Sequence, residues 1–239
     1  MLAFVPSPKT VWHRHLVERP DTHAWVLNLY RAGEQHPENV DDYFPSRHAP
    51  WPALAADLVR HAADERRHAR MYEKAIERMG EPVEEMGGRS VFNVVIRACT
   101  SATFRINDGD PPELVRDKLA HFCAHAHFLE RRITRSLGYH HDACQHGGHD
   151  AVAAVVARVL ADEERHQAYT LAAVHELVDR RRAEAILDVH RRGERRANLE
   201  FSQLQVSAFL DRFRDACTAR RALAYRFGAA LMQEASHHV

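Results

Sequence analysis

The 239-residue sequence lacks any cysteine pair of the C-x-x-C type, although it contains four cysteines. They stand far apart, at Cys99, Cys123, Cys144 and Cys217. This spacing argues against a structural zinc site and against an appended rubredoxin-like iron centre. Nothing in it indicates a disulfide framework, so we expect a reducing compartment and predict a cytoplasmic protein.

The sequence also lacks net charge and long apolar segments. Lys+Arg and Asp+Glu both number 33, so the formal charge at pH 7 is zero. A balanced charge gives no general argument for binding nucleic acid or an anionic membrane. No stretch approaches the roughly 20 apolar residues of a membrane span, and the first residues do not resemble a signal peptide. We therefore predict neither a membrane partner nor a nucleic-acid partner.

Strand-like alternation of apolar and polar residues is missing too. Apolar residues at helical spacing, broken by Gly and Pro, predict helices instead. These helices cover about residues 23–35, 52–79, 89–105, 112–137, 149–178, 182–216 and 218–234. We expect a helix stop at Gly138, followed by a His- and Gly-rich loop over 139–148. The prediction is one all-α domain over 1–239, with a core at about 23–178 and a C-terminal helical extension at about 182–234.

The pattern Ala-Asp-Glu-x-Arg-His occurs twice in the chain. Its Glu and His are Glu65 and His68 in the first copy and Glu163 and His166 in the second. A Glu and a His three positions apart on a helix project from the same face. A single copy is most simply a charged surface helix, whereas two copies with matching flanks favour a metal site.

Each copy has a Glu at a similar distance upstream. Glu34 precedes Glu65 by nearly the same spacing that separates Glu130 from Glu163. An antiparallel helix pair with a turn between its members would return both groups to the same level. One Glu from each of two helices and a Glu-x-x-His from each of two others make a dinuclear metal site in a four-helix bundle. Glu38 is the alternative to Glu34.

The residue types indicate which metals such a site would hold. Carboxylates and imidazoles together suit iron or manganese. A ligating histidine usually donates its other N–H to a carboxylate, which fixes its orientation. Asp64 and Asp162, which directly precede the two ligand glutamates, could each reach the histidine of the opposite helix. Arg67 and Arg165 could then neutralise these aspartates.

This arrangement resembles the ferritin-like diiron-carboxylate superfamily, which includes bacterioferritins, rubrerythrins, the small subunit of class I ribonucleotide reductase and bacterial diiron hydroxylases. The resemblance covers about residues 23–178 and rests on the repeated Asp-Glu-x-Arg-His. It implies a ferritin-like four-helix bundle that holds two iron ions, or one manganese and one iron. The ligands that it implies are Glu34, Glu65, His68, Glu130, Glu163 and His166.

The resemblance also suggests two residues with a catalytic role. Thr134, one turn after Glu130, resembles a proton-delivery residue of the bacterial hydroxylases, and Tyr72 has an offset from His68 like that of the radical tyrosine in the reductase subunit. An ordinary helix threonine and core packing of the tyrosine are the simpler interpretations. Three further residues, Cys123, His127 and His61, could line the pocket or simply pack.

The function that the sequence favours is a diiron oxidoreductase that activates dioxygen and oxidises or hydroxylates a small organic substrate. A separate electron donor such as a ferredoxin would then be a partner, and a homodimer is compatible with the pattern. The alternatives are an iron-storage protein, a rubrerythrin-like peroxidase and a tRNA-modifying diiron hydroxylase. The helical extension after Val178 favours the oxidoreductase, because storage needs little beyond the bundle.

Overall fold

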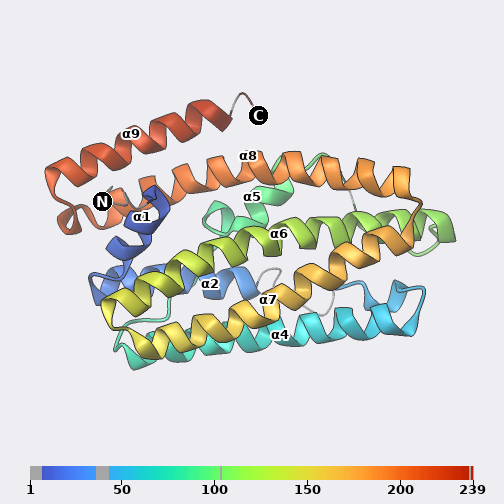
Figure 1. Cartoon of the computed structure of the whole chain (residues 1–239), viewed down its shortest axis with the longest axis horizontal. Coiled ribbons are helices and arrows are strands. Elements are labelled where there is room, and N and C mark those ends of the chain that lie inside the picture. The colour runs from blue at the N-terminus through green and yellow to red at the C-terminus, as the bar shows by residue number, and fades with distance from the viewer. Residues whose placement is uncertain (1–6, 36–42, 103, 237, 239) are drawn as a thin grey trace, which may run out of the picture.

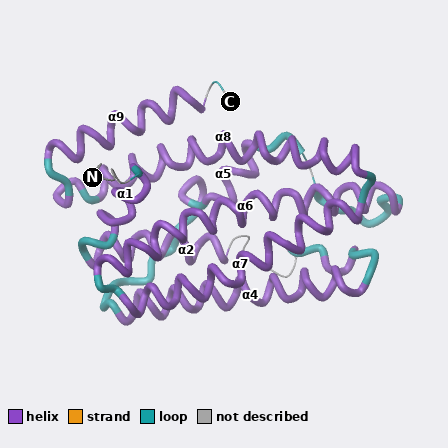
Figure 2. The backbone as a smooth tube through the Cα atoms, in the orientation of Figure 1, coloured by secondary structure: helices purple, strands orange, loops and turns teal. Residues whose placement is uncertain are grey.

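A computed structural model describes residues 7–35, 43–102, 104–236 and 238. This part of the chain holds eight α-helices and no strand, so the all-α prediction is confirmed (Figures 1 and 2). Glu38, the alternative first-helix ligand, lies outside these residues. The helices are α1 (Pro8–Leu16), α2 (Pro20–Gln35), α4 (Pro52–Arg78), α5 (Phe92–Cys99), α6 (Pro112–Gly147), α7 (Asp150–Leu177), α8 (Arg180–Arg212) and α9 (Ala219–Ser236).

The helix starts follow from local chemistry. Proline is the first residue of α1, α2, α4 and α6, where its fixed φ suits a helix and its missing N–H leaves no donor unpaired. Helix α8 begins after Asp179, whose side chain accepts a hydrogen bond from the Arg182 backbone N–H at 3.0 Å. Such a cap satisfies one of the free donors of the first turn.

Helix α6 is longer than predicted, because it continues through Gly138 to Gly147. The predicted stop at Gly138 and the loop over 139–148 are therefore wrong. A glycine inside a helix costs only about 1 kcal/mol relative to alanine, and the burial of Leu137, His140 and Cys144 in this stretch offsets that cost. The helix ends where Gly148 adopts a left-handed conformation with φ 75° and donates its N–H back to the last turn.

The helix predicted over 89–105 is also too long. Only Phe92–Cys99 is α-helical, and the backbone is extended at Thr100. Two apolar side chains beyond it, Phe104 and Ile106, pack on the core instead of following a helical face. The other predicted helices agree with α2, α4, α7, α8 and α9 to within a few residues.

Helices α2, α4, α6 and α7 together enclose one apolar core. A single cluster of buried side chains takes members from all four, among them Leu27, Ile76, Leu137 and Val156. The helices α4 and α7 are antiparallel, because Asp64 contacts His166 while His68 contacts Asp162. The short connection at Gly148 makes α6 and α7 antiparallel as well (Figure 1).

The remaining helices cover this core. Helix α8 runs beside α6, and α9 packs on α8 (Figure 1). Aromatic side chains of α1, α2, α8 and α9 form a second cluster around Phe209. Helix α5 lies against α8 at Gly193, where an added Cβ would come within 2.5 Å of Thr100 Oγ1. Among the described residues, no helix combines the length and the apolar character that crossing a bilayer requires.

Candidate metal centre

The six predicted ligands come from the four core helices and meet inside them. Glu34 belongs to α2, Glu130 to α6, and the two Glu-x-x-His pairs to α4 and α7. Leu27 and Glu34 stand two helical turns apart on one face of α2, the face that packs on the core. Five of the six predicted ligands are buried, and only Glu65 is partly accessible.

His68 lies between two glutamates. Its Nδ1 is 3.2 Å from Glu34 Oε2 and 3.3 Å from Glu163 Oε1. Its other ring nitrogen, Nε2, is 3.2 Å from Asp162 Oδ2. If Nε2 carries the hydrogen and donates it to Asp162, the Nδ1 lone pair faces the two glutamates, as in a metal-ligating histidine.

His166 has the corresponding arrangement in the second copy of the repeat. Its Nδ1 is 3.0 Å from Glu163 Oε2 and 3.9 Å from Glu65 Oε1. Its Nε2 is 3.1 Å from Asp64 Oδ2. The predicted reach of each aspartate to the histidine of the opposite helix is therefore confirmed in both directions.

Two arginines hold the aspartates in place. Arg67 contacts both Asp64 and Asp162, with a distance of 2.5 Å to Asp162 Oδ2. Arg165 also contacts both aspartates, with a distance of 2.9 Å to Asp162 Oδ1. The predicted role of these arginines is confirmed, and the four side chains form one closed ring of ion pairs. This ring fixes the orientation of both histidines from behind.

His61 is a member of the centre that the repeat does not identify. Its Nε2 lies 3.3 Å from Glu65 Oε1 and 3.4 Å from Glu130 Oε1, and its ring stacks on that of His166 with centroids 3.6 Å apart. The Nδ1 atom is 2.7 Å from the Tyr169 hydroxyl. The two carboxylate contacts of Nε2 lack hydrogen-bond geometry, and this atom has no hydrogen-bond partner among the described residues. The available signal was its position one helical turn before Glu65, on the same face.

The donor atoms form two groups that share one carboxylate. The first group is Glu34, Glu65, His68 and Glu163, and the second is His61, Glu65 and His166; within each, the possible ligand atoms lie within 4.8 Å of one another. Glu65 therefore stands where a carboxylate can bridge two ions. Glu130 belongs to neither group, but its Oε1 lies 3.4 Å from His61 Nε2, and the neighbouring Glu163 helps to raise its pKa.

The buried carboxylates of the cluster repel one another, so positive charge near them would be stabilising. Burial raises the pKa of Glu65 well above its usual range, and the carboxylates of Glu34 and Glu163 raise it further. Burial and the same kind of repulsion raise the pKa of Glu130. Burial alone would lower the pKa of His68, but Glu34 and Glu163 raise it to about 11. Without metal the cluster must hold protons, and two divalent ions would replace them.

The two residues predicted to be catalytic lie beside the ligands. Thr134 accepts a hydrogen bond from Gln167 Nε2 at 2.7 Å, which ties it to the residue after His166. Tyr72 is fully buried, and its ring lies 5.7 Å from that of Tyr30. Within the described part of the chain its hydroxyl has no hydrogen-bond partner. Nothing in these contacts tests a role in proton delivery or radical chemistry. Cys123 is buried in the neighbouring apolar cluster, and His127 Nδ1 contacts the Gln167 carbonyl.

A cavity of about 190 Å³ lies between α2 and α8, lined in part by Trp25, Leu29 and Leu204. At 100° per residue, Trp25 stands on the face of α2 opposite Glu34. This cavity therefore opens away from the metal centre.

Comparison with known proteins gives no match: neither a family model, nor a curated protein, nor a solved structure is similar to this chain. The interpretation of the centre thus depends on its own geometry.

Proposed function

We propose that this protein is a ferritin-like dinuclear iron oxidoreductase that uses dioxygen to oxidise a small organic substrate. The observation that carries the proposal is the pair of donor groups that share Glu65. Two neighbouring ions bridged by carboxylates and ligated by histidine nitrogens are the usual form of a dinuclear site built from helix faces.

The donor set suits iron and differs from those of structural zinc sites and of calcium sites. Structural zinc sites favour cysteine and histidine in fours, and calcium takes oxygen donors only. Here four glutamates and three histidines face one buried space. Mixed carboxylate and imidazole donors suit iron and manganese. Manganese in one of the two positions is compatible with the same set.

The charges fit two divalent ions. The four glutamates carry four negative charges when ionised, and the raised pKa values of Glu65 and Glu130 arise from burying them together. Two divalent ions supply four positive charges and would leave the buried cluster neutral. The ring of Asp64, Asp162, Arg67 and Arg165 is balanced by itself, with two negative and two positive charges.

A bound pair of iron ions would supply the redox chemistry with dioxygen. The side chains of the chain then have defined tasks. His61, His68 and His166 offer one ring nitrogen to the centre while the other is held by Tyr169, Asp162 and Asp64. Burial of the ligands keeps bulk water away. Insertion of one oxygen atom into a substrate consumes two electrons and two protons, so an external electron donor is part of the proposal.

Oxygen uptake by the iron-loaded protein tests the proposal against iron storage. The protein is loaded anaerobically with ferrous iron, mixed with oxygenated buffer and a chemical reductant, and followed by oxygen electrode and iron analysis. We expect sustained oxygen consumption with two iron ions retained per chain, and loss of both in Glu65→Ala. Uptake of many tens of iron ions per chain into a cage-sized assembly would contradict the oxidoreductase and favour storage.

A further inference from the structure

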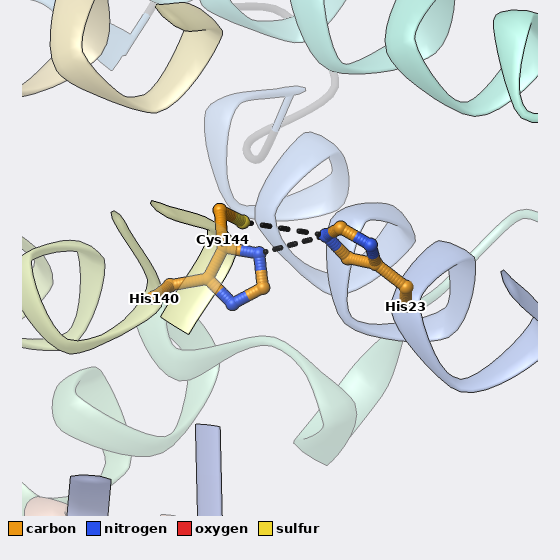
Figure 3. A group of neighbouring side chains, drawn as sticks. All are labelled: His23, His140 and Cys144. Atoms are coloured by element: carbon orange, nitrogen blue, oxygen red, sulfur yellow. Dashed lines mark hydrogen bonds between the residues drawn. The ribbon is translucent and has the colours of Figure 1, made fainter. Parts of the chain in front are cut away.

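A second group of metal-ligating side chains lies near the other end of α2 and α6. His23 of α2 faces His140 and Cys144 of α6, and all three are fully buried (Figure 3). His23 Nε2 lies 3.2 Å from His140 Nε2 and 3.6 Å from Cys144 Sγ. The two α6 residues are one helical turn apart, so they project from the same face.

This group is separate from the carboxylate centre. On α2, His23 precedes Glu34 by about three helical turns, and on α6, His140 follows Glu130 by nearly as much. At a rise of about 1.5 Å per residue, both separations amount to about 15 Å. The two groups share no side chain, so what one binds is independent of the other.

Hydrogen bonding alone does not satisfy the group. A neutral imidazole nitrogen offers either one hydrogen or one lone pair, yet His23 Nε2 faces both His140 Nε2 and Cys144 Sγ. Whichever tautomer His23 adopts, this nitrogen makes only one good hydrogen bond to these two partners. A cation between them would use all three lone pairs at once.

The distances fit a metal ion. With metal–nitrogen bonds of about 2.0 Å and metal–sulfur bonds of about 2.3 Å, ligand atoms around one ion lie roughly 3.3 to 3.7 Å apart. The two distances from His23 Nε2, 3.2 and 3.6 Å, are close to this range. His23 Nε2 therefore stands at nearly a metal-bound spacing from each of the other two ligand atoms, and all three atoms lie within 4.8 Å of one another.

The surroundings of His140 match those of a ligating histidine. Its second ring nitrogen, Nδ1, lies 3.5 Å from His13 Nδ1 of α1, so its N–H can be donated to His13 while Nε2 faces Cys144 and His23. Such an outer partner orients the ligand.

The charge balance selects the cation. The group lies among the apolar side chains of the four-helix core, including Leu27, Leu137 and Val152. Binding of the ion would displace the Cys144 thiol proton, which leaves to solvent. The resulting thiolate and two neutral imidazoles carry a single negative charge, which a monovalent ion neutralises. A divalent ion would leave a buried positive charge, which is costly without a partner. Thiolate and imidazole donors together suit copper in its monovalent state. We propose that His23, His140 and Cys144 bind one monovalent copper ion between α2 and α6.

The first test is an anaerobic titration with Cu⁺ in competition with a chromophoric Cu⁺ chelator. We expect one tightly bound Cu⁺ per chain and, in Cys144→Ser, an affinity at least roughly a hundredfold weaker, since even an outer partner of a ligand contributes 10- to 100-fold. Cys123→Ser is the matched control, because Cys123 is a buried cysteine of the same helix outside the group. It should bind Cu⁺ as the unaltered protein does. Equal affinity of the Cys144→Ser and Cys123→Ser variants would overturn the proposal.

The second test needs no variant and so does not depend on the folding of Cys144→Ser. Copper-edge X-ray absorption of the 1:1 protein should show one sulfur and two nitrogen neighbours. The carboxylate centre offers only oxygen and nitrogen, so copper bound there would show no sulfur. Absence of sulfur, failure of Cu⁺ to bind, or preferential retention of Zn²⁺ from an equimolar mixture with Cu⁺ would each overturn the copper assignment. His13→Phe should weaken binding by roughly tenfold if His13 orients His140.

Discussion

The α2–α4 half of the core and the α6–α7 half carry the same Asp-Glu-x-Arg-His frame, but they differ where side chains face the metal centre. In both halves the aspartate reaches the histidine of the opposite helix and the arginine contacts both aspartates. On the inner face, however, His61 stands one turn before Glu65, whereas the equivalent position before Glu163 is Val159.

This difference makes the two proposed metal positions unequal. One donor group combines three carboxylates with a single histidine, and the other combines His61 and His166 with the shared Glu65. Oxygen donors favour manganese more than imidazole does. The aspartates and arginines that orient the histidines thus occur in both halves. The extra donor His61, which makes the two positions differ, occurs in one half only.

The largest effect is expected where the halves differ most. His61→Val gives the first half the residue found at position 159 and removes a nitrogen donor from one position only. We expect one of two iron ions to bind roughly 10- to 100-fold more weakly and the other to bind as before. Ferrous titration of the apoprotein, followed by calorimetry, measures both events. Val159→Ile, which keeps an apolar residue at the equivalent position, is the control; two unchanged affinities in His61→Val would mean that His61 only packs.

Removing the arginine of the Asp-Glu-x-Arg-His frame should destabilise the protein equally in either half. Arg67→Ala and Arg165→Ala each remove charge-assisted hydrogen bonds to two buried aspartates. Each variant should lower the free energy of unfolding of the metal-free protein by about 2 kcal/mol. Urea denaturation with the slope held in common gives the values. A difference of more than about 1 kcal/mol between the two variants would show that the frame is not equivalent in the two halves.

The pKa of a buried histidine outside the centre should shift in the opposite direction from that of His68. Burial lowers the pKa of His190 to about 3, with a further contribution from His121, 3.1 Å away, whereas the carboxylates raise the pKa of His68. Below its ordinary pKa of about 6.5, His190 binds a proton only in the unfolded chain. Stability should therefore fall as the pH drops from 6.5 toward 3, by up to about 1.4 kcal/mol per pH unit for this group.

His190→Gln should remove that contribution. The variant and the unaltered protein are compared by urea denaturation at several pH values between 7 and 5. The slope of stability against pH should be shallower in the variant, with no change of slope above pH 7. Parallel curves would show that His190 is not held neutral in the fold.

The positions one turn after the two ligand histidines offer a smaller contrast. The buried Tyr72 hydroxyl has no hydrogen-bond partner among the residues that the structure describes, whereas Thr170 Oγ1 donates to the His166 carbonyl at 2.6 Å. Tyr72→Phe should raise the free energy of unfolding of the metal-free protein by about 1 kcal/mol, and Thr170→Val should lower it by a similar amount. A loss of stability in Tyr72→Phe would mean that the hydroxyl is bonded after all.

Sequence spacing was sufficient for the parts of the centre that repeat. Glu65, His68, Glu163 and His166 meet because a three-residue spacing fixes one helix face, and Asp64 follows from its place beside Glu65. His61 was not assigned as a ligand, because it has no counterpart in the other half and a histidine on a core-facing helix is more often simply packed. Spacing also does not determine which atoms of different helices come into contact.

The group of His23, His140 and Cys144 was missed for another reason. Gly138 predicted the end of a helix, which placed His140 and Cys144 in a loop, where their one-turn spacing has no meaning. The helix continues because this stretch is buried against α2 and α7. Local propensity is a weak prior that tertiary packing overrides, and a single glycine changed the interpretation of two potential ligands.

The iron content of the purified protein tests the central claim most directly. Apoprotein is incubated anaerobically with excess ferrous iron, passed through a desalting column and analysed for iron per chain. We predict two iron ions for the unaltered protein, one for His166→Ala, and none for Glu65→Ala, since Glu65 is common to both donor groups. Circular dichroism confirms that the variants are folded. An unchanged iron content in both folded variants would contradict a dinuclear centre at this place.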